Sequence, residues 1–445
     1  MFDDVRKSVE KIASKHKVEE YEMVLSRHDF TSFSIEQRDL TVSSEVGVSS
    51  LGLRLLKKGK LTYASTTVAD EAALEHVISA ALTNLQPTAL KVFARIPTGL
   101  SWDDADEKIT DLVTRPRRLR DLLSATVSET WERGNGKFER LNGNGGVGLA
   151  EEWVFTSGSA EPSYRRGTGF NAYIDLDSRD FEILVKTRLP KPREIETLGA
   201  KVARRLPKRS AKPSDLGLKG KETDVVLHPF CLASMFSNVI AEHIYATSKL
   251  SGLSRFKAGR KHASSVVTIA DDGAYHEFIS RGPTDEEGTK TRRNVLFDKG
   301  VFKTFAYDAE TAVLDRTEST GNGMRRPVLA EESHEAPVRP TLRGLVMEPG
   351  GIKLKDMIKD VKKGIMLKFL LGIHTADKVS GSFSNTAYLS YVIENGKLTS
   401  TAEPGTWAMR GNALGLLKTI DAVSTERFLT GSSLLPWVKT RLYVG

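Results

Sequence analysis

Only one cysteine, Cys231, occurs among the 445 residues. A single thiol excludes an intramolecular disulfide and any zinc site built from several cysteines. Long apolar runs are also missing, because none approaches the roughly 20 residues that a membrane-spanning helix needs. The first residues form a charged amphipathic pattern without the apolar core of a signal peptide. We therefore expect a cytoplasmic protein that does not enter a membrane.

Paired metal-ligating histidines are absent as well. Nine histidines are scattered along the chain, and none forms H-E-x-x-H or another pair at helical spacing. Glu242 and His243 are adjacent in an apolar stretch typical of a helix, where neighbours point about 100° apart and cannot share one ligand face. We interpret His243 as a partly buried histidine and Cys231 as a core residue. No G-x-S-x-G nucleophile motif occurs, so residue chemistry alone predicts no active site.

The excess of positive charge is modest. The formal net charge is +8, and much of the excess lies in residues 186–221. A basic cluster can bind nucleic acid, but no aromatic side chains interleave with it to stack on bases. We favour a solvated basic helix and linker, and nucleic acid is the weaker alternative.

One glycine-rich motif requires a decision between two interpretations. Residues 143–148 read G-N-G-G-V-G, a literal G-x-G-x-x-G. A dinucleotide site needs this motif to follow a strand and to open a helix. Residues 153–157 have the pattern of a strand instead, so we favour a hairpin turn.

The length and the hydrophobic pattern predict an α+β protein of three parts. Residues 1–95 read as an N-terminal α/β domain, with amphipathic helices over 4–15 and 70–82 packed on a sheet. Residues 96–221 read as a central helix-and-strand region, with a long helix over 106–133 and a basic linker at its end. Residues 222–445 read as a strand-rich antiparallel domain with a few helices, among them 230–250 and 407–422.

The densest stretch of signals is residues 271–323. Acidic, glycine-punctuated turns at 271–273 and 285–288 precede two β-rich runs, which are separated by Asp298, Lys299 and Gly300. Two such runs around a short turn indicate a β-hairpin. The stretch closes on S-T-G-N-G, where two glycines around an asparagine allow positive φ or a close approach of another group.

This stretch resembles the TldD/PmbA family, also called the modulator-of-DNA-gyrase family. The family's D-D-G strand, D-E-G turn, T-x-R-x-V-L hairpin and T-G-N segment occur here in the same order within residues 271–323. Further motifs follow, among them I-E-N-G-K at 393–397 and G-N at 411–412. The resemblance extends over nearly the whole chain and is strongest from residue 222 onward.

The resemblance also assigns a branch of the family. TldD-like chains carry H-E-x-x-x-H on the helix after the entry strand and a cysteine near the C-terminus, which together hold zinc, and the Glu is the general base of a peptidase. Here the motif positions fall approximately on Ser237, Asn238 and Glu242, and residues 430–434 contain no cysteine. The chain therefore resembles the TldE/PmbA-like branch, which lacks the zinc motif.

This branch implies a non-catalytic subunit of a TldD/TldE-type zinc metalloprotease heterodimer that acts on unfolded peptides. No cofactor is then expected in this chain, and zinc is expected in a TldD-like partner. Thr320, Gly321, Asn322 and Gly323 are the candidates for a close backbone approach to a peptide. The alternative is a stand-alone homodimer that binds peptides or modulates DNA gyrase.

Overall fold

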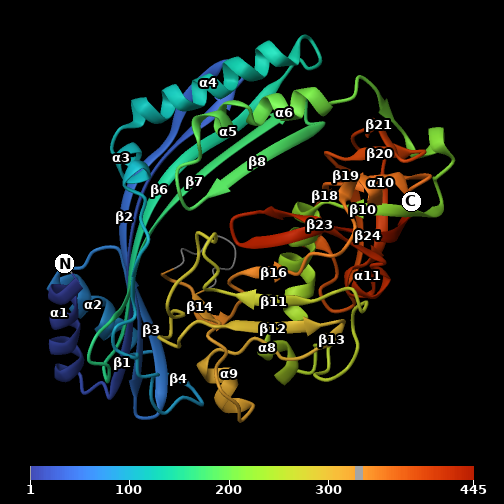
Figure 1. Cartoon of the computed structure of the whole chain (residues 1–445). Coiled ribbons are helices and arrows are strands. Elements are labelled where there is room, and N and C mark those ends of the chain that lie inside the picture. Colours follow the sequence, from blue (N-terminus) through green and yellow to red (C-terminus); the bar gives the residue numbers. More distant parts are fainter. Residues whose placement is uncertain (1, 326–333) are drawn as a thin grey trace.

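The computed structural model describes residues 2–325 and 334–445. Within these residues most strands join into two sheets, one of eight strands and one of 14. Figure 1 shows the first sheet, coloured blue to green, as a tall curved layer beside the second, coloured mainly yellow to red. Helices and mainly antiparallel strands share the chain, which confirms the predicted α+β class. No described helix is long and apolar enough to cross a membrane.

The first sheet is built on a long hairpin. β1 (Glu20–Glu36) and β2 (Asp39–Lys57) pair along their whole length, with one register shift between Ser32 and Phe33. The other strands are β3 (Lys60–Thr66), β4 (Gln86–Pro87), β5 (Ser101–Asp103), β6 (Leu141–Thr156), β7 (Ser163–Leu176) and β8 (Asp180–Lys186), in the order β4-β3-β2-β1-β6-β7-β5 with β8 beside β7.

Helices cover one face of this sheet, as Figure 1 shows. On β1, the odd-numbered Met23, Leu25, Phe33 and Ile35 are buried against them, because alternate residues of a strand share a face. The even-numbered residues belong to the opposite face, which we call the inner face. The helices are α1 (Phe2–Lys15), α2 (Glu71–Ala81), α3 (Glu107–Val113), α4 (Pro116–Gly134), α5 (Pro192–Glu196) and α6 (Leu198–Arg205).

Local signals explain where these helices begin and break. The helix predicted over 70–82 is α2, and the Asp70 carboxylate caps it by accepting a hydrogen bond from the Ala73 amide at 2.8 Å. The predicted helix over 106–133 is instead two helices, α3 and α4. Pro116 causes the break, because it has no amide hydrogen and disfavours helical geometry at Arg115.

The G-x-G-x-x-G motif lies inside β6, so the predicted hairpin turn is wrong. Its glycines make room for neighbouring elements. A Cβ on Gly145 would meet the Leu123 side chain of α4 at 2.4 Å, and one on Gly143 would meet the Tyr173 carbonyl oxygen at 2.3 Å. A motif in mid-strand opens no helix and offers no helix N-terminus to a pyrophosphate.

The first sheet extends across the predicted boundary at residue 95, because β1 pairs with β6. The predicted linker contains β9 (Ser210–Ala211), which pairs with the second sheet, and the 3₁₀ turn η1 (Pro213–Leu216). The division into domains at residues 95 and 221 stays a prediction.

The second sheet encloses the largest core. β10 (Lys221–Leu227) lies between β24 (Ser433–Val444), which is antiparallel, and β17 (Lys363–Leu367), which is parallel. Trp407 is fully buried in this core. The other strands are β11 (Ile269–Asp272), β12 (Arg293–Asp298), β13 (Val301–Phe302), β16 (Leu345–Met347), β18 (Phe369–Leu371), β19 (Ser382–Tyr388), β20 (Tyr391–Glu394), β21 (Lys397–Ala402), β22 (Ala408–Asn412) and β23 (Ala422–Leu429), and β14 (Gly323–Arg325) pairs with β15 (Val338–Pro340) apart from it.

Two predicted helices of this half differ from the structure. The run over 230–250 is divided into α7 (Pro229–Met235), a π-helical turn η2 (Phe236–Ile240), a 3₁₀ turn η3 (Ala241–His243) and α8 (Ala246–Leu250). The predicted helix over 407–422 begins as β22 and becomes helical only in α11 (Ala413–Thr419), which Asn412 caps through the Gly415 amide. The remaining helical segments are α9 (Ala309–Leu314), α10 (Leu354–Lys359) and η4 (Ile373–Thr375).

Candidate functional site

The positions of the family's zinc motif lie on the irregular helical segment after β10. Ser237 and Asn238 belong to the π-helical turn η2, and Glu242 belongs to η3. The Ser237 hydroxyl donates to the Ser234 carbonyl oxygen at 3.2 Å, and the Asn238 amide donates to the same oxygen at 2.8 Å. A π-helical turn inside a helix is frequent at functional sites.

A cavity of about 180 Å³ brings this segment together with the C-terminal strand region. We call it the serine cavity. Ser237 and Tyr245 line it on one side, and Ser432 and Ser433 line it on another. Residues 341–345 complete the wall, with Arg343 among them. Ser237 therefore lines the same cavity as residues 432–433. These two residues belong to the segment where the resemblance placed a cysteine in TldD-like chains.

The residues of the serine cavity do not fit zinc. Zinc in proteins takes imidazole nitrogen, thiolate sulfur and carboxylate oxygen, whereas this wall offers hydroxyl groups and a guanidinium. In the described part of the chain no group of three or more His, Cys, Asp or Glu could hold a metal ion.

The nearby histidine and the cysteine have structural roles. The His243 ring is buried, and its Nδ1 accepts a hydrogen bond from the Arg255 amide at 3.1 Å. Burial lowers the pKa of His243 and raises the pKa of the Cys231 thiol to about 12. Cys231 lies in the core of the second sheet, so its interpretation as a core residue is confirmed. His243 is more deeply buried than predicted, and its Nε2 has no hydrogen-bond partner among the described residues.

The predicted peptide-contact residues are buried. The Thr320 hydroxyl accepts from the Tyr307 amide at 2.7 Å and donates to Asn322 Oδ1 at 2.7 Å. The Asn322 amide donates to Asp271 Oδ2 and to the Thr341 carbonyl oxygen, at 2.7 and 2.8 Å. The segment 320–323 thus ties β11 to the wall of the serine cavity through internal hydrogen bonds. A contact between it and a peptide stays a prediction.

The acidic turn at 285–288 joins the two sheets through buried ion pairs. Arg54 of β2 forms a bidentate pair with Glu22 of β1, and its Nη1 lies 2.7 Å from Glu287 Oε1. Arg325 lies 3.4 Å from Glu22 and 3.6 Å from Glu286. We call these five residues the ionic junction. Burial raises the pKa of Glu286 to about 7 and that of Glu287 to about 8.

Sequence reasoning identified the turn but missed Glu22 and Arg54. Each is a single charge between apolar neighbours in a strand, as in Tyr21-Glu22-Met23 and Leu53-Arg54-Leu55. This pattern is a usable signal for buried pairs on an inner face, although it equally describes a strand with one solvated face.

A cleft of about 570 Å³ lies beside the ionic junction, between the inner face of the first sheet and the acidic turn. Val24, Ser26, His28 and Phe30 of β1 line one wall of the cleft. The charged side chains that line it are Glu152, Arg165, Glu286 and Arg325.

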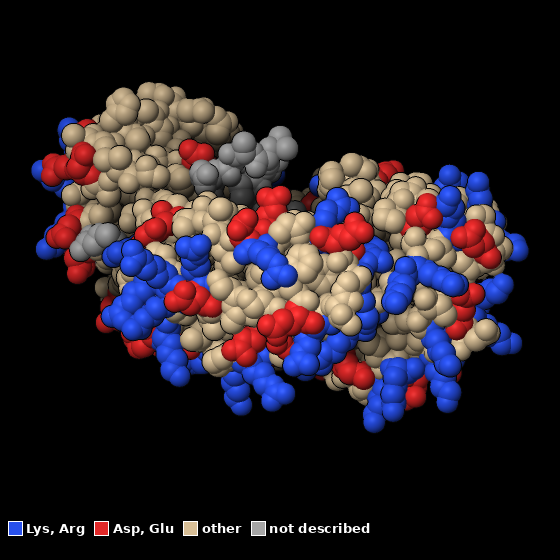
Figure 2. All heavy atoms as spheres, turned by 90° about the horizontal axis from the view of Figure 1, so that it is seen from above, with Lys and Arg blue, Asp and Glu red and all other residues tan. Residues whose placement is uncertain are grey.

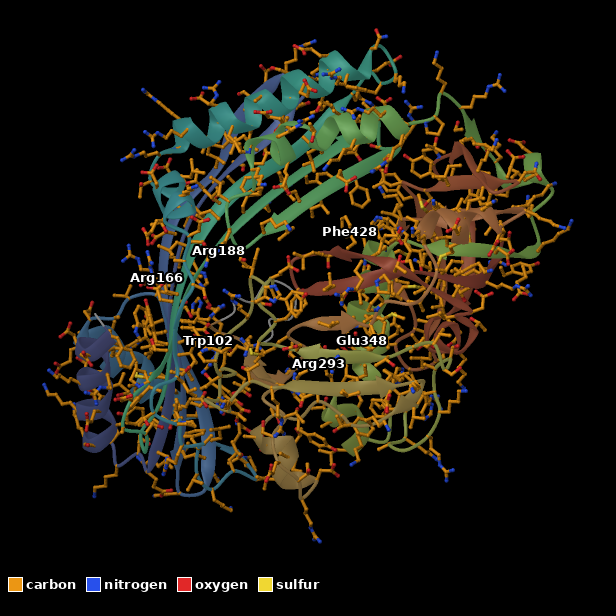
Figure 3. The ribbon with its side chains drawn as sticks, in the orientation of Figure 1. Trp102, Arg166, Arg188, Arg293, Glu348 and Phe428 are labelled. Atoms are coloured by element: carbon orange, nitrogen blue, oxygen red, sulfur yellow. The ribbon has the colours of Figure 1, made fainter. Side chains whose placement is uncertain are left out.

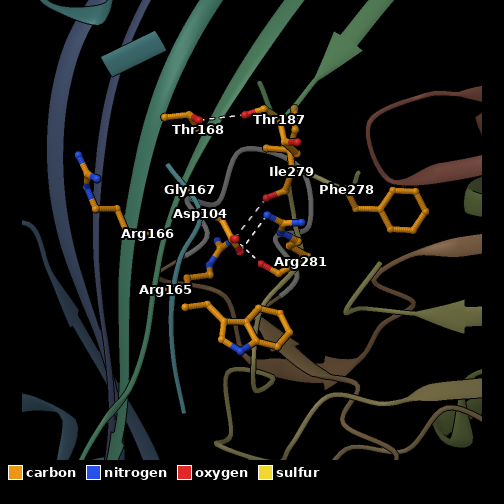
Figure 4. Close-up of a pocket in the computed structure, with 10 residues that line it drawn as sticks. Asp104, Arg165, Arg166, Gly167, Thr168, Thr187, Phe278, Ile279 and Arg281 are labelled. Carbon is orange, nitrogen blue, oxygen red and sulfur yellow. Dashed lines mark hydrogen bonds and ion pairs between the residues drawn. The ribbon is translucent and has the colours of Figure 1, made fainter. Parts of the chain in front are cut away.

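A smaller cavity next to this cleft is closed by its own ion pairs. Figure 4 shows Asp104 against Arg281, at 2.8 Å, and Arg165 against the carbonyl oxygens of Ile279 and Arg281. Its volume of about 20 Å³ has room for little more than one water molecule.

Figure 3 shows Trp102 of β5 on the first sheet and the ion pair between Arg293 and Glu348 on the second.

Fold and site together define a two-sheet α+β protein whose C-terminal sheet carries a helix-lined cavity without metal ligands. Residues 220–443 match the family model described as the PmbA/TldA metallopeptidase C-terminal domain, and residues 21–85 match domain 1 of the same metallopeptidases. The chain belongs to the PmbA/TldD family, as its motifs predicted.

This chain is similar to known proteins at low sequence identity. An uncharacterized protein of Methanocaldococcus jannaschii is 25% identical over 376 residues, which are 80% of this chain and 80% of the relative. A metalloprotease of the same organism is 31% identical over 170 residues, which cover 38% of this chain and 36% of the relative. This second alignment spans only about a third of the metalloprotease.

Solved structures show the same fold. The structure of TldE from Thermococcus kodakarensis has a TM-score of 0.83 at 21% identity and covers 100% of this chain and 99% of its own. A proposed modulator of a DNA gyrase from Thermotoga maritima has a TM-score of 0.80 at 20% identity, with 100% of both chains covered.

Proposed function

We propose that this chain is the non-catalytic, TldE/PmbA-like subunit of a TldD/TldE-type zinc metalloprotease heterodimer. The observation that supports this role is the serine cavity. It brings the zinc-motif segment and the C-terminal segment together, but it supplies serine hydroxyls where a zinc site needs imidazole and thiolate. In this proposal the zinc and the general base belong to a TldD-like partner.

The role of this chain would be to shape the space in which an unfolded peptide is held. A cleft of about 570 Å³ is within the usual size of ligand sites. Its lining combines apolar side chains with both signs of charge, and exposed strand backbone can pair with an extended chain without reading its sequence. These features suit a subunit that accepts many peptides.

The proposal is tested by separating the two chains. The purified chain alone is expected to hold less than stoichiometric zinc by elemental analysis and to leave an unfolded peptide uncleaved. Co-expressed with a TldD-like metalloprotease, it should yield a complex with one zinc per pair that cleaves the peptide. The matched control is the same complex with the partner's general-base Glu replaced by Gln, which should assemble and be inactive. Stoichiometric zinc and peptidase activity in the isolated chain would overturn the proposal.

A further inference from the structure

The positive charge of this chain is concentrated in one segment. Residues 186–221 contain 12 Lys or Arg and three Asp or Glu, whereas the net charge of the whole chain is +8. The rest of the chain is therefore close to neutral. The end of this segment lies on the second sheet, where β9 pairs with β21 and β10 pairs with β17.

The fold brings two further basic segments beside residues 208–221. Lys363 Nζ donates to the Leu216 carbonyl oxygen at 3.2 Å, which ties the start of β17 to η1. The Asn395 amide donates to the Lys362 carbonyl oxygen at 2.7 Å, which ties the turn between β20 and β21 to the same region. Three segments that are far apart in the sequence are thus neighbours: residues 208–221, 359–363 and 394–397.

Basic residues dominate these three segments. They contain nine Lys or Arg, whereas their acidic residues are Asp215, Asp360 and Glu394. Seven of the nine basic side chains are exposed, and their charged groups form no ion pair or hydrogen bond within residues 2–325 and 334–445. We call these seven the basic surface: Lys208, Arg209, Lys219, Lys221, Lys359, Lys362 and Lys397. Figure 2 shows Lys and Arg gathered at the right end of the molecule, which the second sheet and its surroundings form.

The composition of the basic surface discriminates between anionic partners. Protein interfaces are enriched in aromatic residues, Met and Arg and depleted in Lys, whereas six of these seven residues are Lys. Stable attachment to a membrane needs an apolar anchor besides the positive charge. The large apolar side chains of the same segments, Leu216, Leu218 and Val361, are buried. The basic surface thus lacks what a protein interface or a membrane anchor requires.

The lack of aromatic residues argues against single-stranded nucleic acid, because its bases stack on such rings. Tyr443 is 42% exposed beside Gly220, but a single ring does not form a stacking platform. A duplex stacks its own bases and presents a regular row of phosphates, which Lys and Arg neutralise whatever the sequence. The argument against nucleic acid drawn from the sequence therefore applies to single strands and not to duplexes.

We propose that the basic surface binds double-stranded nucleic acid through its phosphates and without sequence preference. Clustered charges of one sign repel one another and attract a polyanion, and binding releases the counterions of the duplex. The hydroxyl of Tyr443 can contact a phosphate as well. None of the seven residues lines the serine cavity or the cleft beside the ionic junction. The inference therefore goes beyond the proposed function and does not depend on it.

Fluorescence anisotropy of a labelled DNA duplex of about 30 base pairs, titrated with the full chain, tests the proposal. Binding is expected at about 50 mM salt and should weaken steeply toward about 200 mM, because each neutralised phosphate contributes about 0.9 to the slope of log affinity against log salt. Two duplexes of unrelated sequence should bind equally. The triple variant Lys219→Gln/Lys221→Gln/Lys362→Gln should bind at least about tenfold more weakly and lower the slope by about one for each lysine.

The matched control removes the same charge elsewhere. Lys7→Gln/Lys91→Gln/Lys108→Gln alters three exposed lysines of the N-terminal part of the chain, and it should keep the affinity and the slope of the unmodified chain. Equal losses in the two variants would show that net charge alone drives binding and would overturn the proposal. No binding at about 50 mM salt would overturn it too, as would tighter binding of the single strand than of the duplex. Binding to phosphatidylserine vesicles without binding to the duplex would assign the basic surface to a membrane instead.

Discussion

Arg54 is the residue with the most demanding environment in the first sheet. Its guanidinium is 2% exposed and lies between the carboxylates of Glu22 and Glu287. We predict that Arg54→Met lowers the free energy of unfolding by about 3–5 kcal/mol, because it removes the bidentate partner of the buried Glu22 carboxylate. Urea unfolding followed by far-UV circular dichroism measures this loss.

The matched control is Arg95→Met. Arg95 also pairs with a glutamate, Glu20, but its side chain is 47% exposed, and exposed pairs contribute about 0–1 kcal/mol. Similar losses in the two variants would show that Arg54 does not depend on its buried partners.

Glu287 should make stability depend on pH. Burial raises its pKa to about 8, whereas a carboxyl of the unfolded chain has a pKa near 4. Between about pH 5 and 8 the folded chain then binds more protons at this group, so its contribution to stability falls as pH rises. Buried histidines such as His228 and His243, whose pKa values are lowered, act in the opposite sense. The informative quantity is therefore the difference between two chains.

We predict a difference between Glu287→Gln and the unmodified chain when the pH rises from 5.5 to 8.5. The free energy of unfolding of the variant should fall less, or rise more, than that of the unmodified chain. Urea midpoints at both pH values provide the measurement. Glu36→Gln is the control, because Glu36 is exposed, and it should follow the unmodified chain. Parallel pH profiles of the Glu287 variant and the unmodified chain would contradict the prediction.

At the scale of elements, the glycines of β6 and β7 differ in what surrounds them. Gly145 of β6 has the Leu123 side chain within 2.4 Å of where a Cβ would be, whereas Gly167 of β7 has nothing within 4 Å. We predict that Gly145→Ala destabilises the chain by about 1–3 kcal/mol, because α4 must move away from the sheet. Gly167→Ala should be neutral or slightly stabilising. Thermal unfolding compares the two, and equal effects would show that close helix packing is not the reason for Gly145.

The same glycines show what sequence can predict. Where a local rule decides, sequence and structure agree. The helix predicted over 70–82 is α2, which Asp70 caps. Asn395 and Gly396 form the turn between β20 and β21, with positive φ at both residues. The glycines at 143–148 were assigned to a turn because glycine in a sequence usually marks a turn or a loop. Their role in β6 is tertiary, since it depends on a side chain of α4 some twenty residues earlier in the sequence.

The candidate site was likewise predictable only in part. Family spacing placed Ser237 on the helical segment, and the structure puts it in the serine cavity with Ser432 and Ser433. No local pattern could show that Glu22 and Arg54 meet Glu287, because pairing between the two sheets is set by the whole fold. Burial of Thr320 was equally hidden, since the Tyr307 amide that donates to its hydroxyl lies before α9 in the chain and Thr320 lies after it.

At the scale of the whole molecule, two buried polar clusters join the sheets. One is the ionic junction around Arg54. The other centres on Asp180 at the start of β8, which pairs with Arg205 and with Lys368 and Tyr391 of the second sheet. Lys368 Nζ also donates to the Phe181 carbonyl oxygen at 2.8 Å. Each sheet has its own apolar core, so these clusters hold together two halves that are each packed within themselves.

We predict that the double variant Arg54→Met/Lys368→Met separates thermal unfolding into two transitions. Each substitution removes one buried cation, the partner of Glu22 in one cluster or of Asp180 in the other. Halves that each have a core can then unfold as separate cooperative units. Differential scanning calorimetry should show one transition in the unmodified chain and two in the double variant. The control is Arg95→Met/Lys439→Met, which removes two ion pairs with partly exposed side chains and should keep one transition. A single transition at lower temperature in the Arg54/Lys368 variant would mean that apolar contacts, rather than the two buried clusters, couple the halves.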